Sequence, residues 1–261
     1  PLVLFEKDST EFSLILSAYN KAKVFKTSEF YFKPIKLNDK SLTMRLQTSQ
    51  PNSYIDFIYT LNSNDYIVNS GFNLVGMQTI LSSNVDDLQL NWRMLYPSQE
   101  KYIVKERQAA TVYFKQVENK PDYINPMKDE VKELTDADIK WVSFKQQFFN
   151  STIIANTKFE RGGSLVETSN RPNTPGIVKA VKTELGVKYN HTPNEKFEYK
   201  FYFGPNHYNT LKAYNDELEG IIPTGWSIFS YINKWMVIPL FNGLSNLNMG
   251  IVILILKINV K

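Results

Sequence analysis

The sequence predicts a mainly β protein whose largest part, residues 1–204, is one antiparallel sandwich. Short runs of alternating apolar and polar residues recur along this part, and turn-forming asparagine, aspartate, serine, glycine and proline separate them. The chain also has 15 tyrosines and 17 phenylalanines, which favour strands. No apolar run of helical period competes with these strands, and 261 residues suit a single large β domain.

Eight alternating runs are the clearest predicted strands. They are residues 42–46, 54–59, 66–75, 88–94, 111–114, 142–154, 180–187 and 197–203. Two other segments, 115–138 and 162–176, each contain two prolines and are predicted to be irregular surface excursions. Strands at this spacing without intervening helices indicate a large sandwich.

Composition excludes several classes of protein. The net charge is +4 and the basic residues are spread along the chain, so we expect weak attraction to anionic lipid but no nucleic-acid binding. The absence of cysteine excludes disulfides, thiolate metal sites and cysteine nucleophiles, and it fits either redox compartment. The apolar run Pro1–Phe5 is too short for a signal peptide, so any export element is expected upstream of it.

The pattern changes after Gly204. Residues 205–222 are predicted to form a helix that packs on the β domain, with Pro205 at its start and Gly220 at its end. The apolar face of this helix follows the i, i+3, i+4 spacing and consists of Tyr208, Leu211, Tyr214 and Leu218.

The last quarter of the chain has a different composition. Between Trp226 and Leu256 only Lys234 is charged, whereas 21% of the whole chain is charged. This contrast indicates that the segment lies in or near a membrane. The stretch is not expected to be one spanning helix, because helix-breaking and turn-forming residues interrupt it at Pro239, Asn242–Gly243 and Ser245–Asn246.

Residues 225–244 are predicted to form an amphipathic helix that lies in the headgroup layer of a membrane. Two tryptophans, one tyrosine and a single lysine are residue types favoured at that layer. The alternative is a buried core helix of the β domain. The apolar face predicted to meet lipid consists of Trp226, Phe229, Ile232, Trp235, Met236 and Leu240.

Residues 249–261 are predicted to be the start of a transmembrane helix. As a helix, the segment from Gly250 to Lys261 would measure about 18 Å, which is too short for a hydrocarbon core of about 30 Å. It therefore looks like part of a longer span. A buried strand is the alternative, since its β-branched residues suit that as well.

Several motifs, taken in order, resemble the YidC-type membrane protein insertases. Near the C-terminus they are Gly225–Trp226, Pro239–Phe241, Gly250–Leu256 and Val260–Lys261. Upstream, Lys140–Phe149 resembles the family's strand with a tryptophan, paired glutamines and aromatics, and Phe201–Pro205 resembles its last strand and helix start. The order and spacing of these motifs extend the resemblance over residues 40–261.

The resemblance implies a galactose-mutarotase-like β-supersandwich in the periplasm, joined to the bacterial inner membrane. It implies a membrane insertase and chaperone that helps inner-membrane proteins insert and fold, alone or with the Sec translocon. The implied partners are nascent inner-membrane proteins, Sec translocon components and the lipid bilayer. The resemblance implies no enzyme activity, and it leads us to expect no catalytic residue, metal, cofactor or small-molecule substrate.

The resemblance also assigns a role to one residue of the predicted membrane helix. Lys261 falls where the family has a basic residue that projects into a hydrophilic groove open to the cytoplasm and to lipid. Two nearby residues depart from the family's pattern. Lys257 stands where the family has a small hydroxyl or apolar residue, and Asn259 stands where it has an apolar one. Two further polar groups in one span are costly in lipid.

A periplasmic carbohydrate-binding or mutarotase-like protein is the main alternative, because sugar mutarotases share the supersandwich. Their chemistry needs a general acid and a base, usually histidine with a carboxylate, or two carboxylates. His191 and His207 are the only histidines, and we expect structural roles for both and for the turn-like pair Asp86–Asp87. A third hypothesis, compatible with the insertase, is a docking or chaperone module for Sec partners or emerging protein segments.

Overall fold

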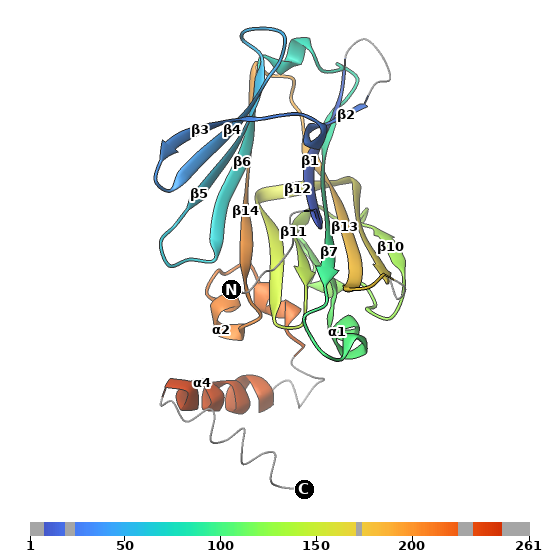
Figure 1. The fold of residues 1–261 in the computed structure, drawn as a ribbon, viewed down its shortest axis with the longest axis vertical. Helices are drawn as coiled ribbons and strands as arrows, with labels where there is room; N and C mark the ends of the chain where they lie inside the picture. The colour runs from blue at the N-terminus through green and yellow to red at the C-terminus, as the bar shows by residue number, and fades with distance from the viewer. Residues whose placement is uncertain (1–7, 19–23, 171–173, 224–231, 247–261) are drawn as a thin grey trace, which may run out of the picture. The chain divides into compact units, whose positions relative to one another are not determined.

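The computed structural model describes residues 8–18, 24–170, 174–223 and 232–246. Residues 1–206 form one unit and residues 207–261 form another (Figure 1). The first unit contains every described strand, and the described residues of the second form helices and turns.

All strand pairs among the described residues are antiparallel, so the predicted mainly β fold class is confirmed. The main hydrogen-bonded order is β2-β1-β7-β13-β12-β14-β6-β5-β4-β3, while β10 and β11 pair with β12, β8 with β11, and β9 with β8. The strands are β1 (Thr10–Ser17), β2 (Val24–Lys26), β3 (Lys33–Asn38), β4 (Ser41–Gln47), β5 (Tyr54–Leu61), β6 (Ile67–Val75), β7 (Asp87–Pro97), β8 (Thr111–Gln116), β9 (Asp122–Tyr123), β10 (Glu130–Glu133), β11 (Ile139–Lys145), β12 (Phe149–Asn170), β13 (Ile177–Lys188) and β14 (Asn194–Pro205).

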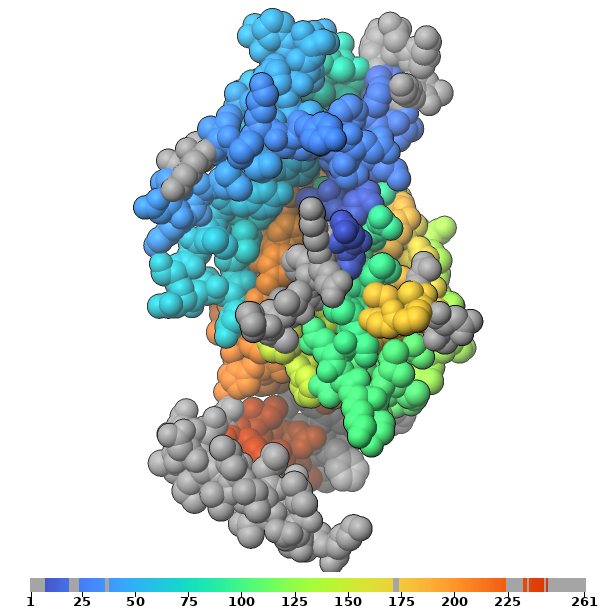
Figure 2. Space-filling model, viewed as in Figure 1, coloured from blue at the N-terminus to red at the C-terminus, as the bar shows by residue number. Residues whose placement is uncertain are grey.

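Strands far apart in the sequence lie side by side in this sandwich. In Figure 1, β3 to β6 lie on one side of β14, and β13 and β7 lie on the other. In Figure 2 the dark blue β1 lies against the green β7. The register of these two strands pairs Phe12 with Trp92. Short helical segments lie between strands at η1 (Thr27–Glu29), η2 (Met77–Thr79) and α1 (Ile103–Ala109).

The core fills the space between the sheets with aromatic and aliphatic side chains. Trp92 stacks on Phe144 with ring centroids 4.2 Å apart, and its edge meets Phe201 at 5.4 Å. Both tryptophans of this unit, Trp92 and Trp141, are almost fully buried. Each large apolar side chain removed from water contributes about 1.5–3 kcal/mol, so this cluster is the main source of stability for the unit.

β12 differs most from the sequence prediction. The predicted strand 142–154 is two strands, because the chain turns at residues 146–148 between β11 and β12. The segment 162–176 was predicted to be irregular, and that prediction is wrong for residues 162–170, which continue β12. Its buried positions Ser164, Val166 and Thr168 do alternate, but two of the three are polar, so hydrophobic periodicity does not reveal the strand.

The charged segment 115–138 is also more regular than predicted. It contains β9 and β10, and β10 pairs with the far half of β12 through Glu130 opposite Thr168. The prediction of a purely irregular excursion is therefore wrong for these short strands. Neither strand shows alternating apolar residues facing the core, because both residues of β9 are exposed and no residue of β10 is buried.

In the second unit, the predicted helix 205–222 is shorter than expected. It consists of α2 (Tyr208–Lys212) and the 3₁₀ turn η3 (Leu218–Ile221), while Pro205 ends β14. Asn215 and Glu217 between them have positive φ angles, which end a right-handed helix. Leu211 and Leu218 are buried, and packing of this segment on the β domain stays a prediction.

A continuous helix covers residues 232–246, comprising the π-helical η4 (Asn233–Val237) and α4 (Ile238–Asn246). Pro239 and Asn242–Gly243 lie inside this helix and do not interrupt it locally. That residues 226–256 do not form one spanning helix stays a prediction. The π-helical turn directly precedes Pro239, and such turns widen the backbone where a proline ring would otherwise clash with the preceding turn. None of the helices that the structure describes has the length and hydropathy needed to cross a bilayer.

Candidate functional site

The helix of residues 232–246 presents an exposed apolar face. The exposed fractions are 41% for Ile232, 72% for Trp235, 60% for Met236 and 56% for Leu240. Their i, i+3, i+4, i+8 spacing places them on one side of the helix. The other residues predicted for this face, Trp226 and Phe229, lie outside the described residues, as do Lys261 and the predicted membrane segment 249–261.

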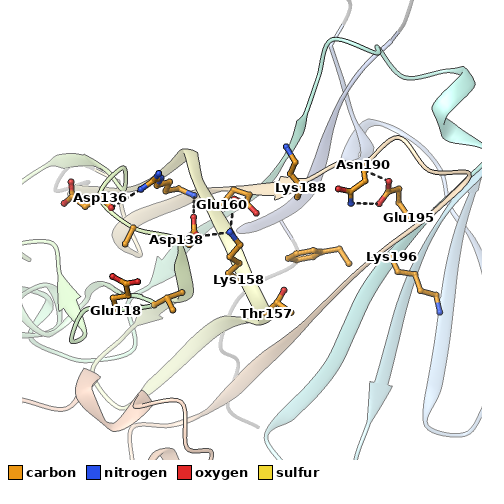
Figure 3. Close-up of a pocket in the computed structure, with 14 residues that line it drawn as sticks. Glu118, Asp136, Asp138, Thr157, Lys158, Glu160, Lys188, Asn190, Glu195 and Lys196 are labelled. Carbon is orange, nitrogen blue, oxygen red and sulfur yellow. Dashed lines mark hydrogen bonds and ion pairs between the residues drawn. The ribbon is translucent and has the colours of Figure 1, made fainter.

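A second candidate site is a polar cleft inside the first unit, which we call the β12–β14 cleft (Figure 3). It has a volume of about 520 Å³. Its walls are formed by β12, the end of β13, the start of β14 and the loops that follow β8 and precede β11. Its charged residues are Glu118, Asp136, Asp138, Lys158, Glu160, Arg161, Lys188, Glu195 and Lys196.

The cleft exists because β12 leaves one partner strand before it meets the next. The register between β12 and β14 ends at Ala155 opposite Tyr199, and the register between β12 and β13 begins at Glu160 opposite Gly186. Residues 156–158 have no cross-strand partner among the described strands. In Figure 3 the strands carrying Thr157 and Lys196 diverge from each other at this point.

β12 also bulges away from β11 here. Ile139 pairs with Phe159 and Trp141 with Ile154, so two steps along β11 correspond to five along β12. The Nζ atom of Lys140 donates hydrogen bonds to the carbonyls of Ala155 at 2.7 Å and of Asn156 at 3.2 Å. β-Bulges change the direction of a strand and are frequent next to binding sites. Lys140 donates hydrogen bonds to two carbonyls that have no partner on β11 because of this bulge.

Ion pairs fix one wall of the cleft. The Nζ atom of Lys158 lies 2.7 Å from Oδ2 of Asp138 and 3.3 Å from Oε2 of Glu160. The backbone N–H of Arg161 donates to Asp138 as well, at 3.2 Å. The hydrogen bond from Lys158 lowers the pKa of Asp138 below its usual range, and the same bond raises the pKa of Lys158.

Hydrogen bonds fix the opposite wall, formed by the arch between β13 and β14. The Oε1 atom of Glu195 accepts from the backbone N–H groups of Asn190 and Thr192, each at 2.9 Å. This carboxylate therefore replaces strand hydrogen bonds that the arch cannot make, and it holds the start of β14 in position.

Several charged groups in the cleft make no ion pair with any residue that the structure describes. They include the carboxylates of Glu118 and Asp136, the guanidinium of Arg161 and the ammonium of Lys196, all on exposed side chains. Arg161 donates a hydrogen bond of 3.5 Å to the backbone carbonyl of Asp136. Each wall of the cleft therefore carries both acidic and basic groups (Figure 3).

This arrangement suits binding better than proton transfer. A catalytic acid of the glycosidase type needs a raised pKa, and the ion pair with Lys158 has the opposite effect on Asp138. The described residues contain no group of three or more histidine, aspartate or glutamate side chains placed to hold a metal ion. The cleft offers charged and hydrogen-bonding groups, and Asp138 among them has its pKa lowered, not raised.

The histidines and the aspartate pair considered from the sequence lie outside this cleft. His191 has a positive φ of 58° in the arch, packs against Tyr189 with ring centroids 4.3 Å apart, and lies 3.8 Å from Asp86. Asp87 faces Lys188 at 3.4 Å, and His207 shares a hydrogen bond of 2.8 Å with Thr210. These contacts are consistent with the structural roles expected for them.

Sequence reasoning missed the cleft completely. Glu118 and Asp136 fall in the segment 115–138, which was predicted to be irregular, and Lys188 and Lys196 fall between the predicted strands 180–187 and 197–203. No spacing in the sequence links Glu118, Thr157 and Lys196, because the cleft arises from the departure of β12 from β14.

Comparisons with known proteins identify relatives of the whole chain. The family model of the YidC periplasmic domain matches residues 1–239. A protein of Azobacteroides pseudotrichonymphae named membrane protein insertase YidC is 35% identical over 272 residues, which cover 100% of this chain and 44% of that protein. A Bacteroides fragilis protein of the same name is 34% identical over 269 residues, covering 100% of this chain and 43% of that protein.

A solved structure shows a looser likeness. A galactose mutarotase related enzyme from Lactobacillus acidophilus aligns with 72% of this chain and 78% of its own, with 10% identity and a TM-score of 0.41. The chain spans less than half the length of the curated relatives that it matches. The family model nevertheless covers both the β unit and the start of the apolar helix, and this chain belongs to the YidC periplasmic domain family.

Proposed function

We propose that the protein helps inner-membrane proteins to insert and fold, and that this chain supplies its periplasmic domain. The observation that carries the proposal is the match of the family model across residues 1–239, together with full-chain relatives named membrane protein insertase. Insertion makes and breaks no covalent bond, so the proposed activity needs no catalytic residue, metal or cofactor.

The helix of residues 232–246 is proposed to lie in the outer headgroup layer of the inner membrane. Its exposed Trp235, Met236 and Leu240 support this position, because large apolar side chains on one helical face gain free energy by entering the interface. Each gains up to about 1.5–3 kcal/mol when fully buried. Trp226 and Phe229 would extend the same face towards the N-terminus of the helix.

The remaining parts of the proposal concern partners and the membrane groove. Nascent inner-membrane proteins are the proposed substrates, and Sec translocon components and the lipid bilayer are the proposed partners. Lys261 is proposed to supply the cation of a hydrophilic groove, since a charge within a membrane span is expensive and is usually retained for a function. Such a cation would lower the cost of moving an acidic segment partway across the bilayer.

Tryptophan fluorescence tests the interfacial helix. Trp92 and Trp141 are buried in the β unit, so an aqueous quencher such as acrylamide acts mainly on the other two of the four tryptophans. With Trp226 replaced by phenylalanine, we expect vesicles of phosphatidylethanolamine and phosphatidylglycerol to protect Trp235 from acrylamide. Equal quenching with and without vesicles would exclude an interfacial position for this residue.

A matched pair of variants tests whether the apolar face drives the binding. Replacing Trp235, Met236 and Leu240 by serine should lower partitioning into the vesicles at least tenfold, about 1.4 kcal/mol or more. The control replaces two exposed tyrosines of the β unit, Tyr31 and Tyr102, which are 98% and 67% exposed. Unchanged partitioning in the first variant would contradict the proposal.

A further inference from the structure

The helix of residues 232–246 carries almost no charge. Lys234 is its only charged residue, and its other polar residues are three asparagines and one serine. Helices that bind membranes through headgroup charge are rich in lysine and arginine on their polar side. One lysine near an anionic surface increases affinity only about fivefold. The charge of the headgroups therefore contributes little to the binding of this helix to a bilayer.

The exposed apolar surface of the helix is wide. Residues 235–241 are all apolar, and they include a tryptophan, a methionine and a phenylalanine. Phe241 is 39% exposed and follows Leu240, which is 56% exposed. Because successive residues of a helix point about 100° apart, Phe241 widens the exposed stripe that contains Trp235 and Met236. The helix therefore presents apolar side chains on more than one side.

Large apolar side chains need room between the headgroups. An amphipathic helix places its apolar face at the boundary between headgroups and acyl chains, and its binding depends on curvature and lipid composition. A bilayer that is strongly curved or rich in unsaturated chains is loosely packed and offers more of that room. Trp235 is 72% exposed and Met236 is 60% exposed, so both side chains have much apolar surface to bury there. Lipid packing is therefore the property of the bilayer to which this face responds most.

The sequence around the helix favours lipid over a protein as its partner. The helix ends at Asn246, and the apolar run 250–256 begins four residues later. Between Trp226 and Leu256 only Lys234 is charged. A typical protein interface surrounds its apolar centre with a polar rim. The near absence of charge before and after the helix instead matches the composition of a segment held in lipid.

We propose that the helix of residues 232–246 recognises loosely packed lipid and is nearly indifferent to headgroup charge. The inference rests on the interfacial position proposed above, and it adds the property of the bilayer that is recognised. The exposed side chains of Trp235, Met236, Leu240 and Phe241 supply most of the binding free energy, and Lys234 supplies a small part. The contact between the helix and the bilayer thus strengthens where lipid packing is disturbed.

Vesicles of two sizes test the proposal on the 261-residue chain with Trp226 replaced by phenylalanine. Because Trp92 and Trp141 are buried, acrylamide quenching then follows Trp235. Dioleoylphosphatidylcholine vesicles with diameters of about 30 nm and about 200 nm differ in packing but not in headgroup charge. The buffer contains about 1 M salt, which shortens the Debye length to about 3 Å. We expect Trp235 to partition at least about fivefold more strongly into the small vesicles, per mole of outer-leaflet lipid.

The same titration distinguishes failure of the inference from failure of the interfacial position. If no vesicle protects Trp235 from acrylamide, the interfacial position itself is wrong, and the inference falls with it. If small and large vesicles protect Trp235 equally, the interfacial position stands and the inference about lipid packing is wrong.

Phosphatidylglycerol tests the expected indifference to charge. In large vesicles at low salt, K234Q should reduce the gain in affinity caused by phosphatidylglycerol by no more than about fivefold, the share of one lysine. The variant N233K/S245K adds two lysines to the helix and should increase that gain at least about tenfold. If K234Q abolishes binding to vesicles with and without phosphatidylglycerol, Lys234 and not the apolar face holds the helix, and the inference is wrong.

A matched pair of variants assigns the preference for loose packing to the helix. M236S/F241S narrows the apolar face and keeps Trp235 as the reporter, so the ratio of affinities for small and large vesicles should fall towards one. I251S/I253S makes the same number of changes in the apolar run that follows, and it should lower overall affinity but leave that ratio at about fivefold or more. If the ratio falls only in I251S/I253S, the following run responds to lipid packing and the inference about the helix is overturned.

Discussion

The Nζ atom of Lys179 donates a hydrogen bond of 2.6 Å to the backbone carbonyl of Ala110. Lys179 is fully buried in β13, and its Nζ atom also donates to Pro126 at 2.7 Å. On the neighbouring residue, the carbonyl of Ala109 accepts a hydrogen bond of 3.0 Å from the buried Lys145. Two buried ammonium groups thus hold the junction between α1 and β8, where the chain leaves a helix for a strand.

These lysines should make the stability of the β unit increase with pH above neutrality. Burial lowers the pKa of Lys179 to about 8 and that of Lys145 to about 8, whereas in the unfolded chain both stay near 10.4. Between these two pKa values the unfolded state therefore binds more protons, and from pH 7 to pH 9 the free energy of unfolding rises by about 1 kcal/mol for each lysine. Urea unfolding at pH 7 and pH 9, followed by the fluorescence of the buried tryptophans, measures this rise.

The matched variants are K145M and K179M, alone and together. Each single replacement should remove about half of the rise, and the double variant should remove most of it. Lys33 lies on the exposed edge strand β3, and the K33M control should keep the rise intact. A rise that persists in the double variant would show that other groups cause it.

The pair formed by Arg45 and Asp56 should contribute more than an ordinary surface ion pair. Arg45 donates two hydrogen bonds to Asp56, from Nε to Oδ1 and from NH2 to Oδ2, each of 2.7 Å, and its guanidinium lies 3.7 Å from the ring centroid of Tyr54. The Asp56 side chain is only 9% exposed. R45M would leave that carboxylate buried without its partner, so we expect a loss of about 2–3 kcal/mol in urea unfolding.

A surface pair provides the comparison for R45M. Arg93 contacts Glu11 at the same distance of 2.7 Å, but the Arg93 side chain is 63% exposed. R93M should therefore lower stability by less than about 1 kcal/mol. R45K keeps the charge but loses the two-pronged geometry, so its stability should fall between wild type and R45M. Similar losses for R45M and R93M would contradict this account.

Gly76 should be far less tolerant of alanine than Gly163. Both have positive φ angles, 63° and 73°, so either replacement costs about 1–2 kcal/mol of backbone strain. A Cβ atom on Gly76 would also lie 2.5 Å from the carbonyl oxygen of Asn52, whereas one on Gly163 would have no neighbour within 4 Å. We expect G76A to lower the free energy of unfolding by at least about 1 kcal/mol more than G163A.

Glu106 should stabilise the loop that precedes α1. Its carboxylate is buried and accepts hydrogen bonds from the hydroxyl of Ser98 at 3.1 Å and from the backbone N–H groups of Gln99 at 3.0 Å and Glu100 at 3.3 Å. E106Q would replace one accepting carboxylate oxygen by an amide NH2 group, which would face hydrogen-bond donors. We therefore expect the free energy of unfolding to fall by about 1–3 kcal/mol. E29Q at an exposed position should change thermal stability by less than about 0.5 kcal/mol.

The strands with strong apolar alternation could be predicted from the sequence with nearly correct boundaries. The run 54–59 is part of β5 and the run 88–94 is part of β7, because one side of each strand faces the core and the other does not. The far half of β12 and the strand β10 could not be predicted. The buried positions of the far half of β12 are partly polar, β10 has no buried residue, and the two pair with each other across more than thirty residues of sequence.

Of the two candidate sites, one was predicted from the sequence and the other was not. The stripe Ile232, Trp235, Met236 and Leu240 was predicted residue by residue, since a helical face is fixed by local spacing, and the structure shows these side chains exposed. The charged lining of the β12–β14 cleft could not be predicted, because no local pattern connects Glu118 with Lys196.

By itself, the sequence determined the class of the fold, the family resemblance and the apolar helix that follows the β unit. These features depend on alternation, composition and spacing over a few residues, which each segment carries locally. Only the tertiary structure decided where β12 leaves β14 and which charges meet around that gap. The physical reason is that register between distant strands is set by packing of the whole core, so a cleft between two diverging strands depends on the pairing of every strand around it.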